Sequence, residues 1–120
     1  MTDAEIDVAR AHLARSDEFA AAAEAAREHG WLNAAAAQLG LAAVAARMAL
    51  AVACPQPLMT AAEADAVPGA VQPLIERLGQ LRDIATLSPD PITDAELQEM
   101  RDICAGLRAR AAAAVAEAAP

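Results

Sequence analysis

The run from Leu32 to Ala53 constrains the fold more than any other part of the chain, because it is apolar on nearly every side. Only Asn33, Gln38 and Arg47 interrupt it. A helix that is apolar all round must be buried or must cross a membrane. Alanine is weakly apolar, Arg47 lies well inside the run, and neither an aromatic belt nor a basic flank accompanies it, so a membrane span is disfavoured. The run therefore predicts a central helix surrounded by other helices.

The composition extends this prediction to the whole chain. Hydrophobic residues make up 57% of it and aromatic residues only 2%, because most of the apolar residues are alanine. Alanine is the strongest helix former, so we predict an all-α fold. A chain of 120 residues is long enough to bury a core, and we expect a single helical domain over residues 1–120.

Capping motifs and helix breakers predict where the helices begin and end. Three Thr-x-x-Glu capping boxes mark helix starts. Gly30 suits a helix stop, and proline pairs end two further helical patterns. The capping boxes are Thr2/Glu5, Thr60/Glu63 and Thr93/Glu96, and the predicted helices are 3–28, 32–53, about 70–87 and about 94–118, with a short extra helix near 60–66.

We read these elements as an antiparallel four-helix bundle. Residues 55–69 hold three of the seven prolines and are interpreted as a connection within the domain. Alanine faces let helices approach closely, and a second copy could cover any apolar surface that remains. The predicted core consists of Leu13, Phe19, Leu39, Val44, Leu74, Leu78, Leu97, Met100 and Leu107.

The charge of the chain and its cysteines indicate which kinds of partner and which cellular compartment to expect. The net charge is −8, and the nine basic residues, all arginine, are scattered along the chain, so nucleic acid is a disfavoured partner. The acidic start of the chain lacks the features of a secretory signal, and we expect a cytoplasmic protein with no membrane partner. Cys54 and Cys104 are expected to be buried free thiols.

The sequence lacks the common short motifs of catalysis and metal binding. It contains no Cys-x-x-Cys pair, His-Glu-x-x-His helix, glycine-rich phosphate loop or Gly-x-Ser-x-Gly turn. His12 and His29 lie about 25 Å apart along the first helix, too far to share a metal or a proton. We therefore predict no catalytic residues, no cofactor and no metal site, and we favour a protein that is not an enzyme.

Two segments resemble HEPN-type helical bundle proteins. Residues 11–22, AHLARSDEFAAA, are followed by residues 30–36, GWLNAAA, and by an Ala/Leu-rich helix. This arrangement resembles the start of that family, and the likeness covers roughly the first 50 residues together with Arg82-Asp83. The resemblance implies four or five helices with a long first pair, and frequently a dimer.

HEPN ribonucleases carry an arginine, a polar residue and then a histidine where two subunits meet. Arg82 and Asp83 are similar to the first part of that motif, but residues 87–89 are Leu-Ser-Pro and no histidine follows His29. Loss of a general acid or base typically lowers a rate by about 10²- to 10⁴-fold. The resemblance therefore implies a non-cleaving member, in which Arg82 and Asp83 could contact an anion. An ordinary surface ion pair of Arg82 with Asp83 or Glu76 is the alternative.

Three functions remain open from the sequence. The first is a non-catalytic interaction module that forms a homodimer or docks on a protein partner, in which Trp31 is either a packing anchor or a partner contact. The second is a degenerate HEPN ribonuclease or nucleotide-binding accessory of a toxin or defence system. The third is a small structural subunit of a larger assembly, such as a phage virion; the arginine and alanine bias suggests a bacterial or phage source.

Overall fold

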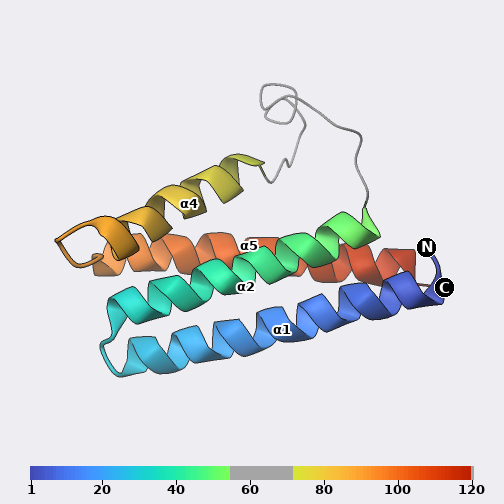
Figure 1. Ribbon diagram of the computed structural model, residues 1–120, viewed down its shortest axis with the longest axis horizontal. Helices are drawn as coiled ribbons and strands as arrows, with labels where there is room; N and C mark the ends of the chain where they lie inside the picture. The colour runs from blue at the N-terminus through green and yellow to red at the C-terminus, as the bar shows by residue number, and fades with distance from the viewer. Residues whose placement is uncertain (55–71, 120) are drawn as a thin grey trace.

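The computed structural model describes residues 1–54 and 72–119, and its regular structure there is entirely helical, as predicted (Figure 1). The helices are α1 (Asp3–Glu28), α2 (Leu32–Ala53), α4 (Gln72–Leu87) and α5 (Asp94–Ala118). The predicted bounds of α1, α2 and α5 are confirmed. The connection 55–69, the short helix near 60–66 and the Thr60/Glu63 capping box lie outside the described residues.

Two predicted capping boxes are formed in full. At the start of α1, the Thr2 hydroxyl accepts from the Glu5 amide at 3.1 Å and the Glu5 carboxylate accepts from the Thr2 amide at 3.2 Å. Thr93 and Glu96 make the same reciprocal pair at the start of α5, at 3.1 and 3.0 Å. These bonds satisfy helix amides that have no partner within the helix, so each start is determined locally by the sequence.

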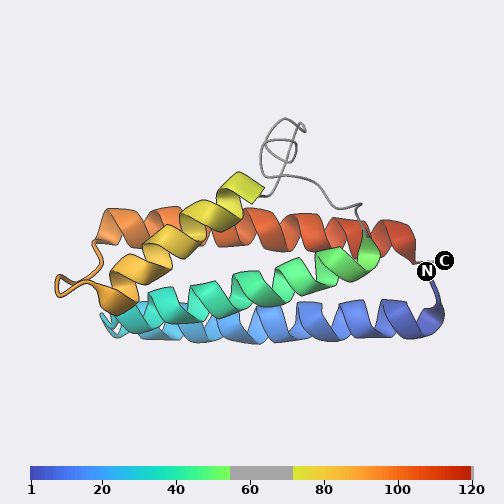
Figure 2. The ribbon, with the colours of Figure 1, turned by 45° about the horizontal axis from the view of Figure 1, so that its top comes forward.

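The central position predicted for the second helix is confirmed. Successive helices alternate in direction along the long axis of the molecule (Figure 1). Within the described residues α2 contacts α1, α4 and α5, whereas α4 contacts α2 and α5 but not α1. Figure 2 shows α4 crossing the outside of α2 and α5. These contacts are compatible with the predicted bundle and make α4 its least embedded helix.

Alanine allows α1 and α2 to lie very close together. The hydroxyl of Ser16 donates to the main-chain carbonyl oxygen of Ala42 at 2.7 Å, a buried bond between a short side chain and the facing backbone. Larger residues at this interface would hold the two backbones too far apart for such a bond. The buried alanines of the two helices are Ala9, Ala23, Ala26, Ala35, Ala36, Ala42, Ala43, Ala45, Ala46 and Ala49.

The predicted core is correct in its centre and wrong at one position. Five of its nine residues are buried, namely Leu39, Leu78, Leu97, Met100 and Leu107. Leu13, Phe19 and Leu74 are partly buried. Val44 is 48% exposed, because its side of α2 lies between α1 and α4 and neither helix covers it. Periodicity could not reveal this, since α2 is apolar on both its covered and its uncovered sides.

Substitution of Ala46 by leucine should destabilise the protein. Ala46 is fully buried, so a larger side chain there must strain its neighbours or displace a helix. We expect the free energy of unfolding to fall by about 1 to 3 kcal/mol. The matched control is Ala21→Leu at an exposed position of α1, which should change stability by less than about 0.5 kcal/mol. Urea unfolding followed by circular dichroism measures both; equal effects would contradict the close packing described here.

Ion pairs join α5 to the helices around it. The Glu24 carboxylate on α1 accepts from Arg101 at 2.7 Å and from Arg27 at 3.0 Å. Arg77 on α4 donates two bonds to Glu99, at 2.6 and 2.9 Å. The hydrogen bond from Arg101 lowers the pKa of Glu24 below its ordinary value of 4.5, and the bond from Arg77 lowers the pKa of Glu99 in the same way.

These shifts predict a loss of stability in acid. A carboxylate whose pKa is lower in the folded chain stabilises the fold above its unfolded pKa of 4.5, and this stabilisation disappears as pH falls through the folded value. We therefore expect the urea concentration at the midpoint of unfolding to decrease when the pH is lowered below about 4.5. Glu24→Gln should make that fall shallower, whereas the exposed control Glu18→Gln should not. Identical pH profiles for the two variants would contradict the assignment.

Candidate functional site

A continuous apolar stripe on α2 is open to solvent. Leu41, Val44 and Met48 are 45%, 48% and 46% exposed. With the exposed alanines of the same face they recur at intervals of three and four residues, the spacing of the contact seam in a coiled coil. We call this set the α2 stripe; it comprises Ala34, Ala37, Leu41, Val44, Met48 and Ala51.

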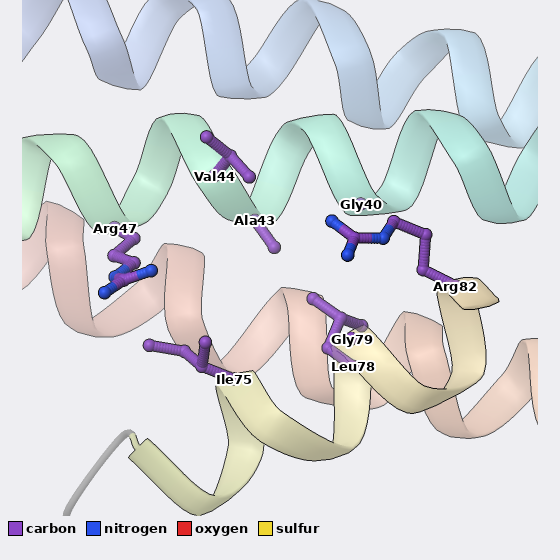
Figure 3. Close-up of a pocket in the computed structure, with 8 residues that line it drawn as sticks. All are labelled: Gly40, Ala43, Val44, Arg47, Ile75, Leu78, Gly79 and Arg82. Atoms are coloured by element: carbon purple, nitrogen blue, oxygen red, sulfur yellow. The ribbon is translucent and has the colours of Figure 1, made fainter.

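A cleft of about 210 Å³ lies beside the α2 stripe, between α2 and α4 (Figure 3). We call it the α2–α4 cleft. Its apolar surface is supplied by Ala43 and Val44 of α2 and by Ile75 and Leu78 of α4. Gly40 and Gly79 also line it, and neither fills it with a side chain. No short sequence motif predicts this cleft, because α4 is positioned by long-range packing on α2 and α5.

Two arginines flank the α2–α4 cleft. Figure 3 shows the side chains of Arg47 and Arg82 extending into the space between the helices. Arg82 packs along Gly40, where a Cβ atom would meet its Cδ at 3.5 Å. Arg47 forms no ion pair with any residue that the structure describes. A cleft with an apolar floor and cations at both ends can bind an apolar surface that carries acidic groups.

The predicted anion-contacting residues lie together at the edge of this cleft. Arg82 approaches Asp83 at 3.6 Å, and their side chains are 52% and 61% exposed. The surface ion pair proposed for Arg82 is thus present with Asp83. A pair so exposed is weak, so both groups remain accessible to other partners. Their contact with an external anion stays a prediction.

Trp31 lies at the end of the molecule where α1 turns into α2. Gly30 has φ +76°, and the Trp31 amide donates to the Ala26 carbonyl at 2.9 Å, which closes the end of α1. The Trp31 ring is 62% exposed and stacks on His29 with ring centroids 4.8 Å apart. Its interpretation as a packing anchor is therefore wrong. Its role as a partner contact stays a prediction.

A second hollow, of about 350 Å³, lies at the same end of the molecule. Its lining includes Arg27 and Arg101, and both of these arginines already donate to Glu24. Glu24 offsets one of these two positive charges, and Asp94, which also lines the hollow, offsets the other. The hollow therefore has less cationic character than the α2–α4 cleft.

The two histidines of the chain are not brought together. His12 lies near the middle of α1, and His29 is the residue that caps its C-terminal end. The Nδ1 atom of His12 is shielded from solvent and has no hydrogen-bond partner among the described residues. Within 1–54 and 72–119, no three His, Cys, Asp or Glu side chains are placed to hold a metal ion.

The two cysteines are unpaired, and they differ in environment. Cys104 is buried against α2, its thiol lies 3.6 Å from the Leu39 carbonyl oxygen, and burial raises its pKa. Cys54 is exposed at the end of α2, so its expected burial is wrong. Side chains at the end of a helix are more exposed because no further turn of the helix covers them.

These environments predict unequal thiol reactivity. A maleimide should label Cys54 of the native protein and should leave Cys104 unmodified, because the thiolate form of Cys104 is suppressed and its sulfur is covered. Denaturation should expose both thiols. Mass spectrometry counts the labels, and Cys54→Ser should take up none while folded. Rapid labelling of that variant would contradict the burial of Cys104.

Within the described residues, α2 is the single helix that is long and apolar enough to cross a membrane, with a mean hydropathy of 1.6. Half of the apolar 18-residue stretch within α2 is buried inside the protein. The core helix of a soluble protein passes the same test of length and composition. The contacts of α2 with α1, α4 and α5 account for the buried half of this apolar surface.

Comparison of the chain with protein-family models, with curated proteins and with solved structures finds no match. The HEPN-type resemblance is therefore neither supported nor refuted by relatives.

Proposed function

We propose that this chain is a soluble, cytoplasmic, antiparallel four-helix bundle that acts as a non-catalytic protein-interaction module. It forms a homodimer or docks on a protein partner, and the α2 stripe is its binding surface. The observation that carries this proposal is the exposure of Leu41, Val44 and Met48 in one row at coiled-coil spacing. The HEPN-like shape implied by the sequence resemblance fits such a module.

The energetics of the α2 stripe favour a helical protein surface as its partner. Each square ångström of apolar surface removed from water contributes roughly 25 cal/mol, and three large side chains there are only half covered. The alanines on either side of them in the stripe, Ala34, Ala37 and Ala51, let another helix approach closely. The stripe lies on a regular helix that packs against three others, so binding orders little additional backbone.

One observation favours a second function, a nucleotide-binding or degenerate ribonuclease accessory. Arg47 and Arg82 flank one cleft, and a phosphate group could bind either guanidinium. The net charge of −8 repels a polyanion, and the sequence lacks the histidine of the HEPN motif. RNA binding or cleavage that Arg82→Ala abolishes would support this function over the interaction module.

Native mass spectrometry of the protein from its own source separates the remaining alternatives. A homodimer, or a complex with one protein partner, would support the interaction module. Recovery only within a large assembly would support a structural subunit. A monomer without any partner at working concentration would contradict the proposed function.

Val44→Asp should abolish the interaction and preserve the fold. Val44 is 48% exposed, so a carboxylate there remains solvated in the free chain but would be buried without a partner in a complex. Val8→Asp is the matched control, since Val8 is 49% exposed on α1. We expect both variants to keep the helicity of the wild type and only Val44→Asp to lose its complex in size-exclusion chromatography. Retention of the complex by Val44→Asp would place the binding surface elsewhere.

A further inference from the structure

The α2 stripe is bordered by α1 on one side and by α4 on the other, and it is open to solvent between them (Figure 1). It extends from Ala34 to Ala51, about 25 Å at the rise of a helix. Its spacing of three and four residues is that of a coiled-coil seam, on which the apolar residues of one further helix can pack. The stripe is therefore long enough for nearly five turns of a partner helix.

Two arginines lie along the edge of the stripe that faces α4. Arg47 and Arg82 line the α2–α4 cleft together with Val44 of the stripe (Figure 3). Among the described residues Arg47 pairs with no carboxylate, and Arg82 has a single exposed pair, with Asp83 at 3.6 Å. Such an exposed pair is weak. Both guanidinium groups can therefore accept a carboxylate from a partner.

Helix α2 has no acidic side chain that offsets these cations. It contains no Asp or Glu, and Arg47 is its single charged residue. The chain as a whole is strongly acidic, with a net charge of −8. Salt screens exposed charges beyond about 8 Å at physiological ionic strength, so the nearby arginines act more strongly on a group in the cleft than the distant acids do. The edge of the stripe is thus a cationic site on an acidic protein.

The spacing of the two arginines matches two turns of a helix. Arg82 packs along Gly40, and Arg47 follows Gly40 by seven residues, about 10.5 Å along α2. Acidic residues seven positions apart on a partner helix are separated by the same distance. In a coiled coil, residues with this repeat line one flank of the apolar seam. A helix lying along the stripe can therefore place one carboxylate at each arginine.

We propose that the α2 stripe and the α2–α4 cleft bind an amphipathic helix of another protein, which carries carboxylates seven residues apart on the flank that faces Arg47 and Arg82. This inference rests on the proposed function and names the chemistry of the partner. The apolar seam of the partner helix packs on Leu41, Val44 and Met48. A second copy that packs its own α2 on the stripe is disfavoured, because α2 supplies no carboxylate.

Two synthetic helices test the chemistry of the partner. The first peptide has three heptads, with leucine in the apolar seam and glutamate at the flanking positions on both sides. Glutamates on both flanks present carboxylates to the arginines in either direction of binding. The second peptide is identical except that lysine replaces each glutamate. Repulsion between like charges at these positions keeps each peptide from pairing with itself.

The wild-type chain should prefer the glutamate peptide. We expect its dissociation constant to be lower than that of the lysine peptide by roughly threefold or more, the effect of two exposed ion pairs. The net charge of −8 acting alone would give the opposite order, so the preference reports the local cations. Fluorescence anisotropy of the labelled peptides measures both constants. Equal affinities, or a preference for the lysine peptide, would overturn the inference.

Charge reversal at the cleft should invert this preference. The double variant Arg47→Glu with Arg82→Glu should bind the lysine peptide more tightly than the glutamate peptide. The matched control is Arg10→Glu with Arg110→Glu, because it replaces two exposed arginines of α1 and α5 and changes the net charge equally. The control should keep the wild-type order, and circular dichroism confirms the fold of both variants. An inverted order in the control as well would assign the preference to net charge and overturn the inference.

The outcomes separate this inference from the proposed function. A homodimer that Val44→Asp disrupts, formed by a chain that binds neither peptide, overturns the inference and keeps the interaction module. Binding of the glutamate peptide that Val44→Asp abolishes supports both. A monomer that binds neither peptide and is recovered without a partner overturns both.

Discussion

The close contact between α1 and α2 is the constraint on which the rest of the structure depends. It uses the smallest side chains available, and the Ser16 hydroxyl reaches the Ala42 carbonyl oxygen across it. Because small side chains cover little area, α2 also needs α5 to complete the burial of its inner side. The larger core residues of α5, such as Leu97, Met100 and Leu107, supply the volume that alanine lacks. Helix α4 packs on the side of α2 and α5 that the other helices do not cover.

The local features of this fold could be predicted from the sequence because their causes are local. Reciprocal hydrogen bonds of Thr2 with Glu5 and of Thr93 with Glu96 determine two helix starts, and Gly30 adopts the positive φ that ends α1. The three residues of α5 in the predicted core, Leu97, Met100 and Leu107, are likewise buried. Such signals lie within a few residues of one another, so tertiary packing does not alter them.

The binding surface could not be predicted in the same way. An apolar pattern indicates burial only when polar residues mark the opposite side, and α2 lacks that contrast. Val44 was therefore assigned to the core, although it is nearly half exposed. The α2–α4 cleft depends on residues far apart in the sequence, such as Gly40 and Arg82, which are 42 positions apart, and no short motif links them. The position of Trp31 was predicted, but not its exposure, because a turn does not determine what covers its side chains.

The peripheral position of α4 has a consequence for the dynamics of the molecule. Within the described residues α4 is held by α2 and α5 alone, so it can open with a smaller free energy than the three helices that enclose the alanine contact. The α2–α4 cleft thus lies between a more stable helix and a less stable one. Its width is set by a local opening equilibrium, and a ligand that contacts both helices would shift that equilibrium toward the closed state. Amide protons of α4 would then exchange more slowly in the complex than in the free chain, while those of α2 would change little.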